Sequence, residues 1–261
     1  MQATERLPVY PDLAGKVVVV TGGSGGIGAV TCRLFAANGA RVAVNGRDQA
    51  RIQAVVEAIR DAGGQAVGVA ADCTDLAAVD QLRQEVEQQL GPAEVLAAFV
   101  GGGRARPGSV VQVPVEDWHS TVDGTLTATF LTLKSFLPGM IQRGRGAILT
   151  MASSAARLPG LGAPAPYVAA KAGVVMLTRE VAGEVGRRGV RVNCLAPHTI
   201  LTEQIQQRAP EEWRQRMAAA VPLGRLGTPE DVALAAVFLA SDSAAWITGV
   251  TLDVAGGYVM T

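Results

Sequence analysis

Short apolar runs alternate with amphipathic stretches along almost the whole of this 261-residue chain. The apolar runs have the length of buried strands, and the stretches between them repeat apolar residues about every three to four positions, as helices do. This pattern predicts strands at Val17–Val20, Val42–Asn45, Ala66–Ala70, Val95–Val100, Ala147–Met151, Arg191–Leu195 and Thr251–Val254. It predicts helices at Ala29–Asn38, Gln49–Ala62, Leu76–Leu90, Val115–Arg143, Tyr167–Arg188 and Pro229–Ala240.

The regular alternation of strands and helices favours an α/β fold. We expect a doubly wound parallel sheet of about seven strands, with helices on both faces and right-handed crossovers. A chain with 49% hydrophobic residues can bury the core of one such domain, and no stretch has the composition of a linker. We assign residues 15–261 to this domain and residues 1–14 to an N-terminal extension. Ligands of such sheets bind at the carboxyl ends of the strands, where the strand order reverses.

Charge and cysteine content limit which partners and ligands the chain is expected to bind. Acidic and basic residues number 23 each, so the chain creates no field that would attract nucleic acid or an anionic membrane. No apolar run is long enough to cross a bilayer, and residues 1–14 lack the features of a signal peptide. The three cysteines have no metal-ligand spacing. We expect a cytoplasmic protein that has no metal site and binds small molecules.

A glycine-rich segment follows the first predicted strand and leads into the first predicted helix. It consists of Thr21-Gly22-Gly23-Ser24-Gly25-Gly26-Ile27-Gly28. In such a strand–turn–helix unit, backbone N–H groups and the positive end of the helix dipole face a pyrophosphate, and larger side chains would block its approach. The segment predicts a dinucleotide site that includes Gly22, Ser24, Gly25, Gly26, Ile27 and Gly28.

A tyrosine and a lysine four residues apart, Tyr167 and Lys171, lie at the start of a predicted helix. Side chains at this spacing share one helix face, so both can point into one site. A tyrosine has an ordinary pKa of about 10, and a neighbouring cation lowers that pKa by favouring the phenolate. Lys171 is the candidate cation. Ser153 and Ser154 follow the strand at Ala147–Met151, and a hydroxyl there can donate a hydrogen bond to a carbonyl oxygen beside Tyr167.

These motifs together resemble those of the short-chain dehydrogenase/reductase family, in the branch of the 3-oxoacyl-carrier-protein reductases. The resemblance extends from Lys16 to Gly257. Besides the glycine turn and the Tyr-x-x-x-Lys pair, it includes Asp72 after the third strand, Arg191-Val192-Asn193-Cys194-Leu195-Ala196-Pro197 with Thr202, Pro222-Leu223-Gly224-Arg225, Phe238-Leu239-Ala240-Ser241-Asp242, Ile247-Thr248-Gly249 and Asp253-Val254-Ala255-Gly256-Gly257.

The resemblance implies hydride transfer between a nicotinamide and a carbonyl or alcohol carbon. At the matching positions, Tyr167 would protonate the nascent alkoxide, while Lys171 would lower the pKa of Tyr167 and bind the nicotinamide ribose. Ser153 would orient the substrate oxygen. Counting along the strand selects Ser153, whereas the commonest serine-to-tyrosine spacing selects Ser154. The resemblance also implies cofactor contacts at Asp72, Cys73, Gly101, Pro197, Ile200 and Thr202, and it implies a homotetramer that pairs its long helices.

Three positions depart from the family pattern. The family's Asn-Asn-Ala-Gly after the fourth strand is replaced by Ala98-Phe99-Val100-Gly101, so apolar packing replaces polar contacts that brace the sheet. Thr125 stands where the family has an asparagine of a water-mediated proton relay, and we expect its hydroxyl to hold a water near Lys171. The usual Pro-Gly after the sixth strand is Pro197-His198. We interpret His198 as a tolerated surface substitution rather than a catalytic acid.

The end of the second predicted strand, Val44-Asn45-Gly46-Arg47, bears on the choice of cofactor. Proteins of this fold that use NAD place an acid there, which accepts from the ribose hydroxyls and would repel the extra phosphate of NADP. Here the position is Gly46, and the guanidinium of Arg47 can bind a phosphate through two hydrogen bonds. Gly25 lacks the second basic residue that many NADP users carry in the glycine turn. We expect NADPH and regard NAD as the less favoured cofactor.

Residues 199–221 are expected to form a mobile substrate lid with both apolar and charged side chains. The sequence thus predicts an NADPH-dependent oxidoreductase that reduces the carbonyl group of a small-molecule or acyl-carrier-bound substrate. Two alternatives stay open. One is an NAD-dependent alcohol dehydrogenase, and the other is a nucleotide-binding regulatory protein with little turnover.

Overall fold

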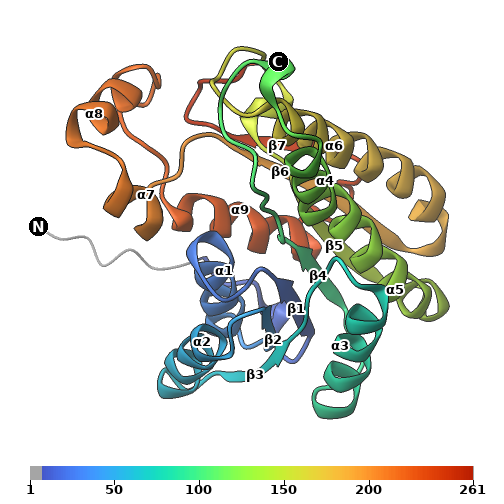
Figure 1. Cartoon of the computed structure of the whole chain (residues 1–261). Helices are drawn as coiled ribbons and strands as arrows, with labels where there is room; N and C mark the ends of the chain where they lie inside the picture. The colour runs from blue at the N-terminus through green and yellow to red at the C-terminus, as the bar shows by residue number, and fades with distance from the viewer. Residues whose placement is uncertain (1–7, 261) are drawn as a thin grey trace, which may run out of the picture.

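The structure, a computed structural model, describes residues 8–260 and contains one seven-stranded parallel sheet. The strands lie in the order β3-β2-β1-β4-β5-β6-β7 (Figure 1). Their bounds are β1 (Val17–Thr21), β2 (Arg41–Gly46), β3 (Gln65–Ala70), β4 (Val95–Ala98), β5 (Gly146–Met151), β6 (Val190–Pro197) and β7 (Thr251–Val254). Each lies where the alternating pattern predicts a strand, and the predicted doubly wound α/β class is confirmed.

Helices cover both faces of the sheet (Figure 1). One face packs against α1 (Gly26–Ala37), α2 (Gln49–Asp61) and α9 (Pro229–Ala240), and the other against α3 (Leu76–Gln89), α5 (Ala128–Arg143) and α6 (Ala165–Val185). Successive residues of a strand point to opposite faces, so Val18 and Val20 of β1 join the first core and Val17 and Val19 join the second. Among the described residues, no helix has both the length and the apolar character needed to span a membrane.

The centre of the sheet lies at β1, which pairs with β2 on one side and β4 on the other. All five residues of β1 are buried, as expected for a strand with neighbours and helices on every side. The chain runs outward from β1 to β3 and then returns to continue at β4, so the strand order reverses between β1 and β4. This reversal opens a crevice at the carboxyl ends of the two strands.

The fourth strand is shorter than predicted. Instead of reaching Val100, β4 ends at Ala98, because the N–H of Phe99 donates to the carbonyl of Ala97 (3.0 Å) and turns the chain. The N–H of Val100 then donates to the Thr21 hydroxyl at the end of β1 (3.3 Å). The segment that replaces the family's Asn-Asn-Ala-Gly is thus tied to β1 and leads Gly101 into the crevice.

The helix predicted at Val115–Arg143 is interrupted. It consists of α4 (Val115–Val122), a π-helical turn at Asp123–Thr127, and α5. A π-helical turn widens the helix locally and often marks a functional position. Thr125 lies in this turn and is fully buried. Hydrophobic periodicity alone does not reveal a π-helical turn, because the apolar residues on both sides of it keep helical spacing.

Part of the predicted N-terminal extension packs on the domain. Its residues 1–7 lie outside the described residues. Leu13, however, is fully buried in the core formed with α1 and α9, and the N–H of Tyr10 donates to the Asn38 side chain (2.7 Å). Leu13 therefore belongs to the core of the domain, and Tyr10 packs against that core.

Candidate active site

The glycine turn connects β1 to α1 at the crevice between β1 and β4. Gly28 lies in the first turn of α1, and a Cβ atom there would overlap the carbonyl oxygen of Gly22. Only glycine allows the chain to fold back so closely. The helix begins after Gly25 without a side-chain cap, so its first backbone N–H groups are available to a ligand. This geometry fits the pyrophosphate of a dinucleotide.

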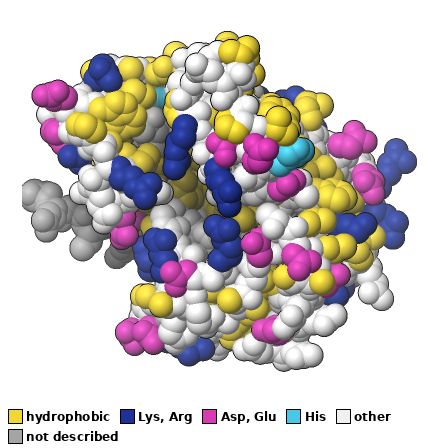
Figure 2. Space-filling model, viewed as in Figure 1, with side chains coloured by type: hydrophobic (Ala, Val, Ile, Leu, Met, Phe, Trp, Pro, Cys, Tyr) yellow, Lys and Arg dark blue, Asp and Glu magenta, His cyan; other side chains and the backbone are white. Residues whose placement is uncertain are grey.

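A cavity of about 600 Å³ extends from the glycine turn across the ends of β1, β2 and β4. In Figure 2 it corresponds to the hollow at the centre of this face, with Lys and Arg side chains on both sides. Arg47 lines it beside β2, and Arg104 lines it from the loop after β4. The predicted cofactor residues that line this cavity are Gly22, Ser24, Arg47, Asp72, Cys73 and Gly101.

The end of β2 is shaped by Gly46. A Cβ atom on Gly46 would lie 2.5 Å from the Oγ and 2.8 Å from the Cβ of Ser24. Any side chain at this position, acidic or not, would therefore push the Ser24 side chain aside. A second cation also lies here, because the guanidinium of Arg51 comes within 3.3 Å of where a Cβ of residue 25 would be. Arg51 belongs to the first turn of α2, which Asp48 caps by accepting from the Arg51 N–H (3.1 Å).

Asn45 fixes the outer wall of the cavity. Its side-chain amide donates to the carbonyls of Val69 (3.1 Å) and Ala71 (3.3 Å), and its oxygen accepts from the Cys73 thiol (3.4 Å). Hydrogen bonds from the backbone and hydroxyl of Thr74 hold the pKa of Asp72 below its ordinary value, and the charge of Arg47 adds to the lowering. Cys73 is thus held at the cavity wall by Asn45 of β2, and the Asp72 carboxylate is held by Thr74.

The chemical groups of the site come from β5 and α6. Ser153 lies just beyond the end of β5, and its hydroxyl is hydrogen-bonded to the phenol of Tyr167 in the first turn of α6. One turn further along α6, the ammonium of Lys171 lies 5.8 Å from the centroid of the Tyr167 ring. The same ammonium donates to the carbonyl of Met151 (2.6 Å) and lies 3.2 Å from where a Cβ of Gly101 would be. The three predicted catalytic side chains therefore meet beside the cavity.

Burial controls the proton affinities of Tyr167 and Lys171. Burial raises the pKa of Tyr167 above its ordinary value, and the hydrogen bond with Ser153 opposes that rise. Burial also lowers the pKa of Lys171 to about 8, against the opposing effect of Cys194. In this structure the Lys171 ammonium is directed to the Met151 carbonyl, and burial sets the direction of the pKa shift of Tyr167. The expectation that Lys171 lowers the pKa of Tyr167 stays a prediction.

The segment expected to form a lid begins beside the glycine turn. Pro197 is buried at the end of β6, and Ile200, also buried, forms a bridge with Gly227. Thr202 caps α7 (Glu203–Arg208), and its methyl group lies 3.4 Å from where a Cβ of Gly26 would be. α8 (Glu211–Ala219) follows, and the two short helices project from the body of the domain (Figure 1). The structure thus brings Thr202 to the glycine turn. The cofactor contacts of Pro197 and Ile200 stay predictions.

Comparison with known proteins identifies the family. A family model described as enoyl-(acyl carrier protein) reductase matches residues 22–259, a range that contains nearly all of the glycine turn and the Ser153, Tyr167 and Lys171 cluster. The chain belongs to the short-chain dehydrogenase/reductase family. It is accordingly an oxidoreductase that acts between alcohol and carbonyl groups.

Relatives within the short-chain dehydrogenases/reductases cover almost the full chain. A 3-oxoacyl-acyl-carrier-protein reductase from Chlamydia pneumoniae is 37% identical over 94% of this chain and 97% of its own length. A protein from Xanthobacter autotrophicus, named inactive 2-(S)-hydroxypropyl-CoM dehydrogenase 2, is 41% identical over 84% of this chain and 95% of its own length. A crystal structure of a 3-oxoacyl-acyl-carrier-protein reductase with bound NAD from Brucella melitensis aligns with a TM-score of 0.90 at 29% identity, covering 100% of this chain and 99% of that chain.

Thr125, which replaces the asparagine of the short-chain dehydrogenase/reductase pattern, contacts the loop after β4. Its hydroxyl donates to the Gly102 carbonyl (3.3 Å) and accepts from the Gly102 N–H (3.4 Å). Gly102 follows Gly101, which lies against Lys171. The structure thus shows Thr125 as a tether for the loop that borders Lys171. The expected proton-relay role of Thr125 remains a prediction.

The interpretation of His198 as a surface substitution is wrong. Its imidazole is half-buried, its Nδ1 lies 2.8 Å from the Ser154 hydroxyl, and its ring stacks on Tyr258. Sequence reasoning also missed Arg51, Asn45 and Tyr258. The sequence signal for Arg51 was its position four residues after Arg47, whereas no local pattern marks Tyr258.

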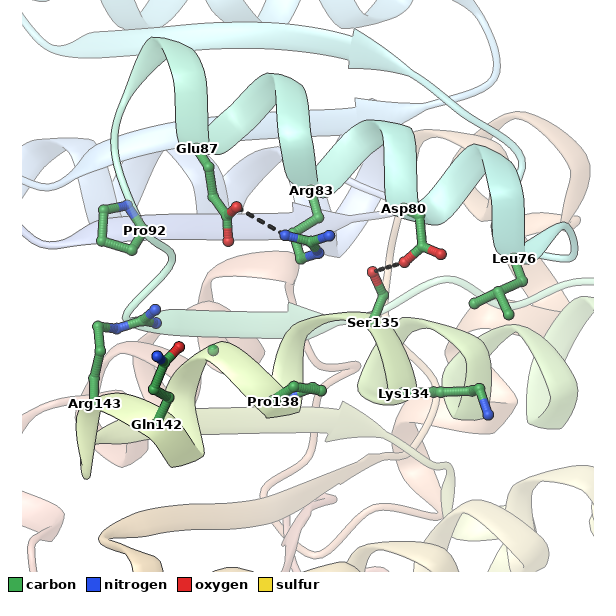
Figure 3. Close-up of a pocket in the computed structure, with 11 residues that line it drawn as sticks. Leu76, Asp80, Arg83, Glu87, Pro92, Lys134, Ser135, Pro138, Gln142 and Arg143 are labelled. Carbon is green, nitrogen blue, oxygen red and sulfur yellow. Dashed lines mark hydrogen bonds and ion pairs between the residues drawn. The ribbon is translucent and has the colours of Figure 1, made fainter.

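A second large hollow, between α3 and α5, lies outside the site (Figure 3). Several of its polar side chains are already paired: Arg83 with Glu87 (2.8 Å) and Ser135 with Asp80 (2.6 Å). Arg143, at its edge, donates to the Ala93 carbonyl (2.6 Å). Because the lining contains no residue from the carboxyl end of a strand, the hollow does not resemble a ligand site of this fold.

Proposed function

We propose that this chain is an NADPH-dependent reductase that converts a ketone or 3-oxoacyl carbonyl group to an alcohol. The observation that carries the proposal is the meeting of Ser153, Tyr167 and Lys171 at the carboxyl ends of β1, β4 and β5, beside a glycine turn shaped for a dinucleotide. A chain that had kept only a nucleotide-binding role would have no reason to hold this cluster together.

In this proposal the bound cofactor supplies a hydride to the carbonyl carbon. Ser153 orients the carbonyl oxygen by donating a hydrogen bond, which strengthens as negative charge develops on that oxygen. Tyr167 then gives its phenol proton to the oxygen. The phenol carries this proton at neutral pH, because its ordinary pKa is about 10 and burial raises the pKa further. Lys171 holds the nicotinamide ribose and balances the charge left on Tyr167.

The preference for NADPH rests on the end of β2. Arg47 lines the cavity and Arg51 lies over Gly25, so two guanidinium groups approach the place where the adenosine ribose of a dinucleotide ends. Guanidinium groups bind phosphate bidentately. Arg51, arriving from α2, supplies the second cation that the glycine turn itself lacks. The contact between a Cβ at Gly46 and Ser24 also disfavours the acidic residue of NAD users.

We further propose a small-molecule or acyl-carrier-bound carbonyl substrate, admitted under a lid formed by residues 199–221. The segment combines the buried Ile200 with charged helices whose residues are all partly or fully exposed. The Chlamydia relative supports an acyl-carrier substrate by its name. We place the protein in the cytoplasm, consistent with the free, buried thiols of Cys32, Cys73 and Cys194.

The proposed assembly is a homotetramer. Large apolar side chains are exposed on α5 (Phe130, 46%), on α6 (Met176, 59%) and at Trp246 (101%), and such surface is usually covered in a stable assembly. Light scattering at micromolar concentration should give the mass of a tetramer. The mass of a monomer would contradict the proposal.

A second candidate is a dinucleotide-binding protein with little turnover, favoured by the 41% identical Xanthobacter protein that is named inactive. Oxidation of NADPH, followed by absorbance with a panel of free ketones and 3-oxoacyl thioesters, separates the two. We expect turnover with at least one carbonyl, faster with NADPH than with NADH, and none with the Tyr167→Phe control. Tight NADPH binding without oxidation by any carbonyl would favour the second candidate, whereas faster turnover with NADH would favour an NAD-dependent alcohol dehydrogenase.

A further inference from the structure

Three side chains from distant parts of the sequence form a continuous contact beside Ser153. The Nδ1 atom of His198 lies 2.8 Å from the Ser154 hydroxyl. The opposite side of the contact is the ring of Tyr258, whose centroid lies 3.9 Å from that of His198 with an angle of 11° between the planes. We call Ser154, His198 and Tyr258 the serine brace. The family pattern has glycine at position 198, so the brace is a feature of this chain.

Backbone hydrogen bonds hold His198 and Tyr258 of the brace in place. The backbone N–H of His198 donates to the carbonyl of Val254 on β7 (3.2 Å), and the N–H of Tyr258 donates to the carbonyl of Ala255 (3.0 Å). Ser154 is only 3% exposed. The imidazole therefore has little freedom to move, and the hydroxyl of Ser154 is committed to it. Ser154 is consequently not available to a substrate, which leaves Ser153 as the serine that faces Tyr167.

The brace acts on the turn that contains the catalytic serine. Ser154 begins the short 3-10 helix η4 (Ser154–Ala156), and Ser153 caps it by accepting from the Ala155 N–H (3.2 Å). That bond, and the bond between Ser153 and Tyr167, together orient the Ser153 hydroxyl. A shift of Ser154 would move the Ala155 N–H, and with it the orientation of Ser153.

We propose that His198 is a positioning residue, which holds the catalytic hydroxyl of Ser153 in place through Ser154 and is itself held by Tyr258. The proposal rests on the proposed reduction, in which Ser153 orients the carbonyl oxygen. Because Ser153 contributes only while charge develops on that oxygen, loss of the brace lowers the turnover number and leaves cofactor affinity unchanged. The Nε2 atom of His198 is buried without a hydrogen-bond partner among the described residues, so the link to Ser154 runs through Nδ1 alone.

Two substitutions separate the hydrogen bond from the stacking. His198→Phe keeps an aromatic ring against Tyr258 but cannot bond Ser154. His198→Asn loses the ring but places an oxygen or nitrogen near the position of Nδ1, where it can still bond the hydroxyl. We expect His198→Phe to lower kcat about tenfold. This loss is larger than that expected for one neutral hydrogen bond and smaller than the roughly hundredfold loss that a misplaced reacting group causes. His198→Asn should stay within about threefold of the unmutated protein.

Ser154→Ala serves as the matched control on the other side of the bond. It should lower kcat as much as His198→Phe, and the double variant should lose no more than either single one, because both remove the same interaction. The dissociation constant of NADPH should stay within about twofold in every variant. Melting temperatures identify variants that are merely unstable.

Nuclear magnetic resonance of tyrosine labelled at the Cζ carbon gives a readout without turnover. The chain has three tyrosines, and Tyr167→Phe assigns the Tyr167 signal. That signal should move in His198→Phe and Ser154→Ala, because the bond between Ser153 and Tyr167 changes, and should stay in place in His198→Asn. The signal of Tyr10 is the internal reference.

The outcomes are distinct. Unchanged kcat and an unmoved Tyr167 signal in His198→Phe would overturn the proposal. An equal loss of activity and melting temperature in the Phe and Asn variants would also overturn it, since a purely structural role predicts that result. If the unmutated protein reduces no carbonyl but the Tyr167 signal follows the expected pattern, the proposed function fails while the positioning of Ser153 by His198 stands.

Discussion

The two halves of the site are built in different ways. The half proposed to receive the pyrophosphate is almost entirely backbone, shaped by glycines whose missing side chains leave room, as at Gly28 against Gly22. The half proposed to perform the chemistry consists of side chains, with Ser153 after β5 and Tyr167 and Lys171 on α6. A site built from backbone groups tolerates the exchange of distant side chains, whereas a site built from side chains depends on each of them. Substitutions in the first half should therefore change cofactor binding, and substitutions in the second half should change turnover.

The largest expected effect is that of Tyr167→Phe. Removal of the phenol proton should lower turnover by about a hundredfold or more, the usual contribution of general acid catalysis. NADPH affinity should remain close to that of the unmutated protein, because backbone groups of the glycine turn and Lys171 hold the cofactor. Steady-state rates and fluorescence titration of NADPH would measure the two quantities. Retention of a tenth or more of the rate would show that another group donates the proton.

Arg47→Asp should act on the other half alone. A carboxylate facing the phosphate of NADPH, in place of a charge-assisted hydrogen bond, should weaken binding by about ten- to a hundredfold and reverse the preference for NADPH over NADH. Arg51→Ala should weaken NADPH binding in the same direction by a smaller factor. Titration of both cofactors provides the test, with NADH affinity as the control for folding. Equal affinities of the unmutated protein for NADPH and NADH would refute the assignment of Arg47.

Lys171 belongs to both halves, because it lies beside Tyr167 and is proposed to hold the nicotinamide ribose. Its titration should therefore change the affinity for the cofactor. Burial lowers its pKa to about 8, so the ammonium is present below that pH and is lost as the pH rises through it. NADPH affinity should therefore fall, by up to about tenfold, between pH 7 and pH 9.5. The second pKa of the cofactor phosphate lies near about 6, so the phosphate is almost fully ionised above pH 7, and arginines stay charged. Neither group accounts for a change in this range. Lys171→Met should bind weakly at every pH. A flat profile in the unmutated protein would show that the charge of Lys171 is not needed for binding.

The smallest expected effect is at Thr125, whose hydroxyl bonds the backbone of Gly102 next to the Lys171 contact. Thr125→Val keeps the shape and deletes the hydroxyl, so turnover should fall about two- to tenfold. Thr125→Asn restores the family residue and should leave turnover similar or raise it. Rates measured across pH, with NADPH affinity measured in parallel, would separate an effect on catalysis from one on binding. A Thr125→Val variant as fast as the unmutated protein would show that this position serves packing alone.

The sequence by itself determined the features that depend on neighbours along the chain. Apolar runs and helical spacing located the strands and helices, because burial requires that periodicity in any fold of this class. The glycine turn was predictable because strand, turn and helix are contiguous and steric exclusion acts within eight residues. The Tyr167 and Lys171 pair was visible because four residues make about one helical turn.

Only the tertiary structure decided what depends on contacts between distant segments. Burial, which no local pattern measures, set the direction of the pKa shift of Tyr167. The roles proposed for Arg51 and His198 depend on contacts that only folding makes, Arg51 with Gly25 and His198 with Ser154. Ser153 and Ser154 are adjacent and chemically identical, so the sequence favoured Ser153 only by counting along the strand. The fold separates them because their side chains meet different partners, Tyr167 for Ser153 and His198 for Ser154.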